Sequence, residues 1–166
     1  MNMTNYMELL ANNQPWNLIL FMGIPVALAE TLVVTEFYVL YTRNLTGVVR
    51  SINRWVGILL GFYFLLLFLY LVATAVVPLS AGSGWRGWID VVAVGSYLAG
   101  VIPLFGIALL EIGVIARNDT PERKLMIHAM LVAAFLVLGH IAMVFGMLDP
   151  TLGGAAAMPG MPSHGH

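Results

Sequence analysis

The sequence has no cysteine and little charge. Without cysteine the chain can form no disulfide, thiolate metal site or thiol nucleophile. Asp, Glu, Lys and Arg make up 9% of its 166 residues, whereas a soluble domain has about 25%. Hydrophobic residues make up 60%, and the mean hydropathy is +0.92. These values predict an integral membrane protein.

Motifs of the common enzyme classes are also missing. There is no P-loop, Rossmann glycine pattern, nucleophile elbow or zincin motif. The Glu-x-x-His pattern of di-iron bundles is absent as well. We therefore expect no enzymatic activity and no nucleic-acid partner.

Four apolar runs occupy residues 16–42, 55–77, 88–116 and 125–148. A membrane-spanning helix needs about 20 such residues, so each run is long enough to cross a bilayer. Residues 1–15 are polar and lack the basic residues of a cleavable signal peptide. Residues 149–166 form a Gly/Ala/Pro-rich tail that we expect to be flexible. The predicted fold is an all-α bundle of four transmembrane helices over residues 16–148.

Basic residues predict the orientation of this bundle. The second connection holds only Arg86, and neither terminus holds any. Loops rich in Lys and Arg stay in the cytoplasm. We therefore expect a multi-pass protein of a bacterial inner membrane with both termini in the periplasm. The other basic residues lie in the first and third connections: Arg43, Arg50, Arg54, Arg117, Arg123 and Lys124.

Carboxylates interrupt the first and third runs. Glu30 falls near mid-membrane, where an ionisable group costs about 2.5–3.5 kcal/mol on insertion scales. Glu36 and Glu111 lie nearer the cytoplasmic side, in the similar segments EFYVLYTRN and EIGVIARN. This similarity predicts two helical hairpins related by a parallel repeat, with the two glutamates at equivalent positions. Pairing of these glutamates with Arg54 or Arg123 is the simpler alternative.

The fourth run contains the two intramembrane histidines. His128 lies near the cytoplasmic side and His140 in the outer half. Stacked by depth, the polar groups predict an intramembrane relay for protons or metal ions. A structural role for each is the alternative. The predicted relay consists of Glu30, Glu36, Glu111, His128 and His140.

Methionine and histidine are concentrated in the tail. Thioethers favour Cu(I), and imidazoles suit Cu(II), so this composition predicts copper binding on the outer side. Met143 follows His140 by three residues and lies on the same helix face. Ordinary packing of the methionines and a chance His-Gly-His ending are the alternatives. The predicted metal ligands are Met158, Met161, His164, His166, His140 and Met143.

Haem b is the other cofactor that these residues leave open. His128 and His140 are twelve residues apart on one helix, about 18 Å, so they cannot hold one haem together. A haem held by one histidine and one methionine, such as His140 and Met22, is compatible with the sequence.

The sequence thus predicts a small membrane protein that binds or transports a cation, with copper as the first candidate. A chain of this size would have to form a homo-oligomer to enclose a path through the bilayer. The alternative is a non-catalytic subunit of a larger electron-transfer or oxidase complex. In that case the buried carboxylates would fix the helix register.

Overall fold

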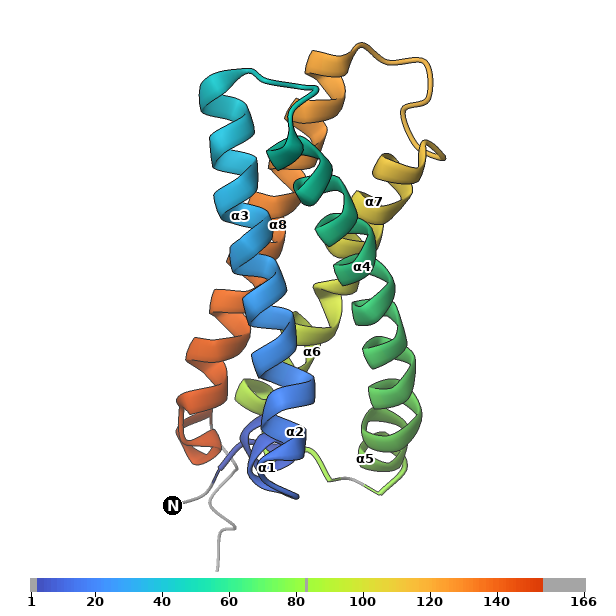
Figure 1. Cartoon of the computed structure of the whole chain (residues 1–166). Helices are drawn as coiled ribbons and strands as arrows, with labels where there is room; N and C mark the ends of the chain where they lie inside the picture. Colours follow the sequence, from blue (N-terminus) through green and yellow to red (C-terminus); the bar gives the residue numbers. More distant parts are fainter. Residues whose placement is uncertain (1–2, 83, 154–166) are drawn as a thin grey trace, which may run out of the picture.

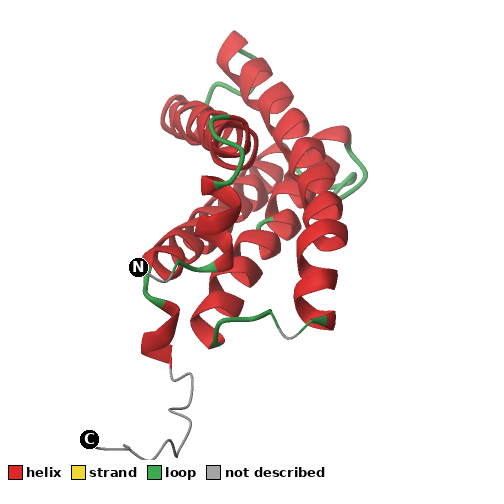
Figure 2. Ribbon diagram, turned by 90° about the horizontal axis from the view of Figure 1, so that it is seen from below, coloured by secondary structure: helices red, strands yellow, loops and turns green. Residues whose placement is uncertain are grey.

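The computed structural model describes residues 3–82 and 84–153, and helices are the regular elements of this part (Figure 2). Four of its helical segments are long and apolar enough to cross a membrane. This confirms the all-α class and the four-helix pattern. The predicted ligands Met158, Met161, His164 and His166 lie outside the described residues. The four segments are Trp16–Thr42, Val48–Ala81, Trp88–Ile112 and Pro121–Met147 (Figure 1).

Short irregularities divide three of these segments. The first runs through α2 (Trp16–Leu18), the π-helical η1 (Ile19–Gly23) and α3 (Ile24–Thr42). The second consists of α4 (Val48–Leu71), the π-helical η2 (Val72–Val76) and α5 (Val77–Ala81). The third breaks at Gly100 between α6 (Trp88–Ala99) and α7 (Val101–Ile112), and the fourth is the single helix α8 (Pro121–Met147). Outside them lie α1 (Asn5–Ala11) and the 3₁₀ helix η3 (Pro150–Gly153).

The π segments precede prolines for a physical reason. Pro25 and Pro78 follow η1 and η2 closely, and neither can donate the backbone hydrogen bond that an α-helix requires. At the first site, tyrosines satisfy nearby carbonyls. The Tyr97 hydroxyl donates to Phe21 O at 2.6 Å, and the Tyr63 hydroxyl donates to Leu20 O at 2.8 Å. The irregular backbone is thereby tied to α6 and α4.

Four helix boundaries differ from the predicted ones by four residues or more, and a glycine explains two of them. The second segment begins at Val48 rather than at 55, because Gly47 in extended conformation starts the helix there. The third ends at Ile112 rather than at 116, because Gly113 has a left-handed φ of 87°. The earlier start places Arg50 and Asn53 on α4, where they can contact the other helices.

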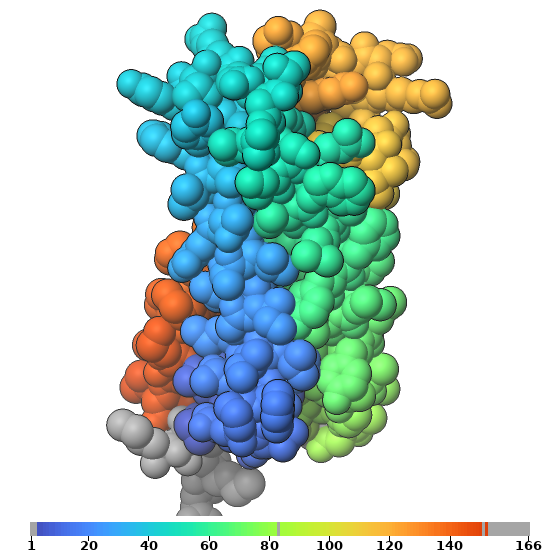
Figure 3. Space-filling view, in the orientation of Figure 1, coloured from blue at the N-terminus to red at the C-terminus, as the bar shows by residue number. Residues whose placement is uncertain are grey.

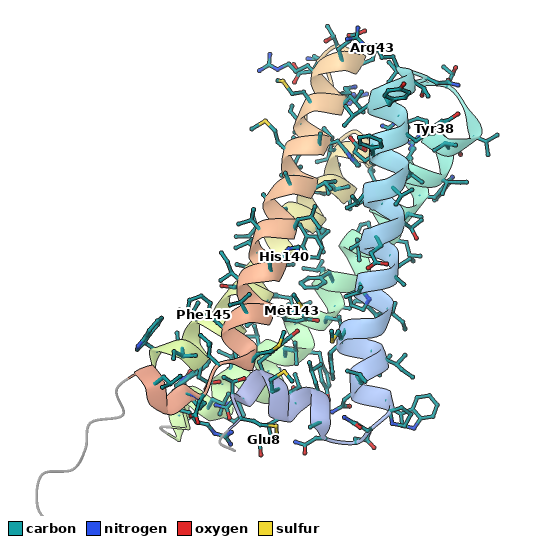
Figure 4. The ribbon with its side chains drawn as sticks, turned by 90° about the vertical axis from the view of Figure 1, so that its left-hand side faces the viewer. Glu8, Tyr38, Arg43, His140, Met143 and Phe145 are labelled. Atoms are coloured by element: carbon teal, nitrogen blue, oxygen red, sulfur yellow. The ribbon has the colours of Figure 1, made fainter. Side chains whose placement is uncertain are left out.

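The bundle is closed more firmly on some sides than on others. The most extensive contacts join α4 to α7 and α6 to α8, while α3 packs mainly on α4. Gly61 allows the close α4–α7 approach, since a Cβ there would lie 2.5 Å from Leu104 O and 2.6 Å from the Ala108 Cβ. By contrast α3 contacts α8 at few residues, and the two helices diverge toward α1 (Figure 4).

The two ends of the bundle differ in composition. One end, called the basic end here, carries the connections 43–47 and 113–120, which lie side by side (Figure 3). The opposite end, called the α1 end, carries α1 packed against α6 and α8. There the Thr4 hydroxyl donates to Gly146 O at 2.8 Å.

Candidate functional site

A buried polar cluster lies one to two turns inside the basic end. Its centre is His128 of α8, whose side chain is completely buried. The His128 Nδ1 lies 2.8 Å from Glu36 Oε2 of α3, and Nε2 lies 3.3 Å from Glu111 Oε1 of α7. The imidazole therefore separates two carboxylates that come from different helices.

Two residues of α4 complete this His128 cluster. Arg50 donates from Nη2 to both Glu111 oxygens, at 2.7 and 3.0 Å, and from Nη1 to Asn53 Oδ1 at 2.7 Å. The fully buried Asn53 amide in turn donates to Glu36 Oε2 at 3.0 Å. All four membrane-length segments thus contribute to one network: Glu36, Arg50, Asn53, Glu111 and His128.

The hydrogen bonding of this cluster is incomplete. Both ring nitrogens of His128 are within ion-pair distance of a carboxylate, yet neither contact has the alignment of a hydrogen bond. Glu36 Oε1 also has no hydrogen-bond partner among the described residues. The formal charge is zero when His128 is protonated and −1 when it is neutral, because Arg50 offsets one of the two carboxylates. One added proton among these groups therefore makes this buried cluster neutral.

The His128 cluster is not arranged as a metal site. Among residues 3–82 and 84–153, no group of three or more His, Asp or Glu side chains could hold a metal ion. Glu36 and Glu111 approach opposite nitrogens of the imidazole, so the ring lies between them and they cannot share one ion with it.

The other predicted relay residues lie elsewhere. Glu30 is exposed on α3 and has no hydrogen bond or ion pair with a described residue. His140 is exposed on α8, and its Nδ1 lies 2.7 Å from the Leu136 carbonyl oxygen. Figure 4 shows His140 and Met143 in the half of α8 nearer α1. The structure brings together Glu36, Glu111 and His128, but does not join Glu30 and His140 to them.

Arg50 and Asn53 are not among the site residues that the sequence predicts. The predicted partners of the glutamates were Arg54 and Arg123, but Glu111 pairs with Arg50, and Arg123 pairs with Asp119 at 3.5 Å. The available signal was the Arg-x-x-Asn spacing, which puts both side chains on one helix face. Hydropathy does not reveal this spacing as helical, because the apolar run begins at residue 55 and both residues precede it.

A second polar cluster lies at the α1 end around the fully buried Asp90 of α6. Asp90 accepts from Asn5 N at 2.7 Å, from Asn5 Nδ2 at 2.5 Å and from Arg86 N at 3.3 Å. The Arg86 guanidinium also bonds Met3 O and the exposed Glu8 carboxylate. This Asp90 cluster fastens α1 to the start of the third segment.

Tyr6 adds an apolar contact to the same end. Its ring packs against Tyr97 with centroids 5.3 Å apart, and burial raises the pKa of its hydroxyl to about 12. The phenol therefore stays neutral over the physiological pH range.

Comparison with known proteins gives a family but no function. No curated protein and no solved structure matches the chain. One family model matches residues 1–162, nearly the whole sequence. The chain therefore belongs to DUF6803, a family of unknown function.

Proposed function

We propose that this protein is a multi-pass membrane protein that handles a cation, and that the cation at the His128 cluster is a proton. The observation that carries the proposal is a fully buried imidazole between two carboxylates, with neither nitrogen hydrogen-bonded to a described residue. Buried ionisable groups in membrane-spanning helices commonly mark ion or proton pathways. Histidine is the side chain whose charge changes most readily near neutral pH.

The proposed topology puts the basic end in the cytoplasm of a bacterium and both termini in the periplasm. Its support is the six-to-one distribution of basic residues between the two ends. The His128 cluster would then take up and release protons on the cytoplasmic side. A reporter fused within residues 43–47 that reads as external would contradict this orientation.

Proton flux into liposomes tests the function directly. Purified protein is reconstituted with an internal pH-sensitive dye, and a potassium gradient with valinomycin sets the membrane potential. We expect wild type to conduct protons and His128→Gln to lose most of the flux, because glutamine keeps polarity but does not titrate. Arg123→Gln is the control on the same helix and should conduct as wild type does, because Arg123 is exposed and pairs with Asp119 outside the His128 cluster. Equal flux in wild type and His128→Gln, or none in either, would contradict the proposal.

Copper handling is the second candidate function, and it is favoured by the exposure and hydrogen bonding of His140. If His140 Nδ1 donates to the Leu136 carbonyl, the lone pair of Nε2 is free for a ligand. The side chain is exposed, and Met143, 39% exposed, offers a thioether three residues later. The copper would be cargo or a bound ion, and the tail residues Met158 and His166 would supply further ligands.

Removing residues 158–166 tests the tail. We expect the truncated protein to keep its helical content and thermal stability but to bind fewer Cu(I) and Cu(II) ions than the full chain. His140→Ala should remove a further ion, whereas His128→Gln should not, because His128 is buried between Glu36 and Glu111. Equal stoichiometry in full-length and truncated protein would remove the tail from the mechanism.

Self-association is the partner arrangement that we propose, with a second copy of this chain. The Glu30 carboxylate and the Nε2 of His140 have no partner among the described residues and belong to exposed residues of membrane-length helices, where an unpaired polar group is costly. Taking the Glu36–His128 contact as a common depth, Glu30 is about 9 Å and His140 about 18 Å toward the α1 end. Side chains of a helix lean toward its N-terminus, and α3 and α8 are antiparallel. The Glu30 side chain therefore leans toward the α1 end and the His140 side chain toward the basic end, which reduces the difference in depth between them. A twofold axis along the membrane normal would allow Glu30 of one copy to approach His140 of the other.

The oligomeric state of Glu30→Leu in detergent tests this arrangement. We expect wild type to be a dimer by light scattering and Glu30→Leu to be mainly a monomer, with Val34→Leu as the control on the same exposed face. A wild-type monomer that co-purifies with other membrane subunits would instead favour the accessory-subunit function. A wild type and a Glu30→Leu variant with the same dimer content would exclude Glu30 from the interface.

A further inference from the structure

A pocket of about 500 Å³ opens at the basic end. Its wall is built by the first turns of α4, the end of α7 and the first turn of α8. This volume lies in the usual range of small-molecule sites, roughly 300–1,000 Å³. The polar side chains of its lining come from Thr46, Arg50, Ser51, Arg54, Glu111 and Lys124.

The charge of this pocket is strongly positive. Three cations line it, Arg50, Arg54 and Lys124, against the one carboxylate of Glu111. Glu111 is already paired with Arg50. Arg54 has no ion pair among the described residues, and Lys124 Nζ donates only to the Arg117 carbonyl, at 3.3 Å. Two positive charges in the pocket therefore have no anionic partner.

Further donors face the same space. Thr46 and Ser51, each of which carries a hydroxyl, belong to the lining. Gly47 caps the N-terminus of α4 and offers no side-chain hydrogen bond to the free N–H groups of the first turn. A helix N-terminus, hydroxyls and guanidinium groups together form the donor set that binds phosphate oxygens.

We propose that this pocket binds the phosphate of an anionic lipid headgroup. The position of the pocket favours a lipid over a soluble phosphate, because it lies where membrane-length helices end. Large apolar side chains next to it are exposed and available to acyl chains: Val48 is 77%, Trp55 67% and Ile112 47% exposed. The headgroup phosphate would lie between Arg54 and Lys124, with its glycerol in the remaining volume.

Arg50 connects this pocket to the His128 cluster. Its guanidinium lines the pocket while donating to both oxygens of Glu111, so a bound phosphate competes with Glu111 for it. Among the described residues, Glu111 is also the only anionic group in the lining. Glu111→Gln should therefore strengthen lipid binding, whereas most polar substitutions in a binding pocket weaken it. This sign is specific to an anionic ligand. Lipid binding in this pocket does not require proton transfer at His128, so either proposal can fail alone.

Native mass spectrometry of the protein from phosphatidylcholine nanodiscs containing phosphatidylglycerol tests the proposal. We expect wild type to retain phosphatidylglycerol, Arg54→Gln/Lys124→Gln to lose most of it, and Glu111→Gln to retain more. The matched control is Arg43→Gln/Arg117→Gln, which removes the same charge at the same end outside the pocket lining. This control should retain lipid as wild type does.

Three outcomes would overturn the proposal. Equal losses in the two double variants would show general attraction to the basic end and no site. Retention by Arg54→Gln/Lys124→Gln equal to wild type would exclude the pocket. Inorganic phosphate supplies a third arm in the same nanodiscs that contain phosphatidylglycerol: if phosphate at millimolar concentration displaces the retained phosphatidylglycerol completely, a soluble anion is the ligand instead. Thermal stability of each variant, measured in parallel, confirms that folded proteins are compared.

Discussion

Both ends of the bundle bury carboxylates near an arginine, but they treat them differently. At the α1 end, Asp90 accepts three hydrogen bonds from Asn5 and Arg86. At the basic end, Glu36 and Glu111 face an imidazole that has no hydrogen bond at either nitrogen within the described part of the chain. The donors of Asp90 are two backbone N–H groups and an amide, none of which titrates. The charge of the His128 cluster, by contrast, depends on one proton.

This difference separates a structural cluster from a candidate functional one. Buried polar groups in native proteins are normally hydrogen-bonded, and exceptions call for an explanation. The Asp90 cluster needs none, since it holds α1 on the bundle. In the His128 cluster, the imidazole lies within ion-pair distance of both Glu36 and Glu111 without a hydrogen bond to either. The predictions below test whether the ends differ in this way.

The largest expected effect is at Arg50. Arg50→Gln leaves the 8% exposed Glu111 without its cation, and breaking a largely buried pair costs about 3 kcal/mol of unfolding free energy. Thermal or chemical unfolding in detergent measures the loss. Glu111→Gln in the same chain removes the uncompensated charge and should restore most of the stability. Two losses that simply add would show that the pair is not coupled.

Asp90→Asn should cost less, about 2 kcal/mol, because charge-assisted hydrogen bonds are lost while the shape is kept. The amide would also present an N–H₂ group to donors. We expect the N-terminal segment of this variant to become accessible to protease, with proton flux at the other end unchanged. A variant that loses flux but keeps α1 protected would reverse the roles assigned to the two ends.

The sequence predicted the four helices but not which faces they bury. Length and hydropathy suffice to find helices that are long and apolar enough to cross a membrane. They do not show which face is buried, because lipid and protein interior are equally apolar. For the same reason α3 has apolar residues all around, and nothing in its periodicity shows that Glu36 points inward and Glu30 outward. Counting residues along the helix gives the depth of Glu30, but depth does not show whether its side chain faces the bundle interior or the outside.

The partners of the buried carboxylates could not be predicted for another reason. Arg50 and Asn53 lie outside the apolar run, so hydropathy alone assigned them to a loop. Asp90 lies in the first turn of α6, yet it bonds Asn5, which is 85 residues distant in sequence. Contacts at such separation depend on how the helices pack, which periodicity does not specify.

Gly146→Ala should weaken the α1 end sterically, by about 1 kcal/mol. A Cβ at this position would lie 2.7 Å from the Tyr6 ring, so α1 must shift. Gly139→Ala, on the same helix with nothing within 4 Å of its Cβ, is the control and should be neutral or slightly stabilising. Proteolysis of the N-terminal segment and thermal unfolding measure both. Equal stability in the two variants would mean that α1 is not held against Gly146.

The smallest effect is expected for the exposed pair between Glu8 and Arg86. Their side chains are 44% and 38% exposed, and exposed ion pairs contribute at most about 1 kcal/mol. Glu8→Gln should therefore lower the unfolding free energy by less than Asp90→Asn does, and the difference from wild type should shrink as salt is raised. Unfolding at low and high ionic strength measures both. The hydrogen bond from the Arg86 guanidinium to the Met3 carbonyl oxygen remains in this variant, so α1 should stay docked. If Glu8→Gln costs as much as Asp90→Asn, then the surface pair rather than the buried carboxylate holds α1, and the α1 end would depend on charge as strongly as the basic end does.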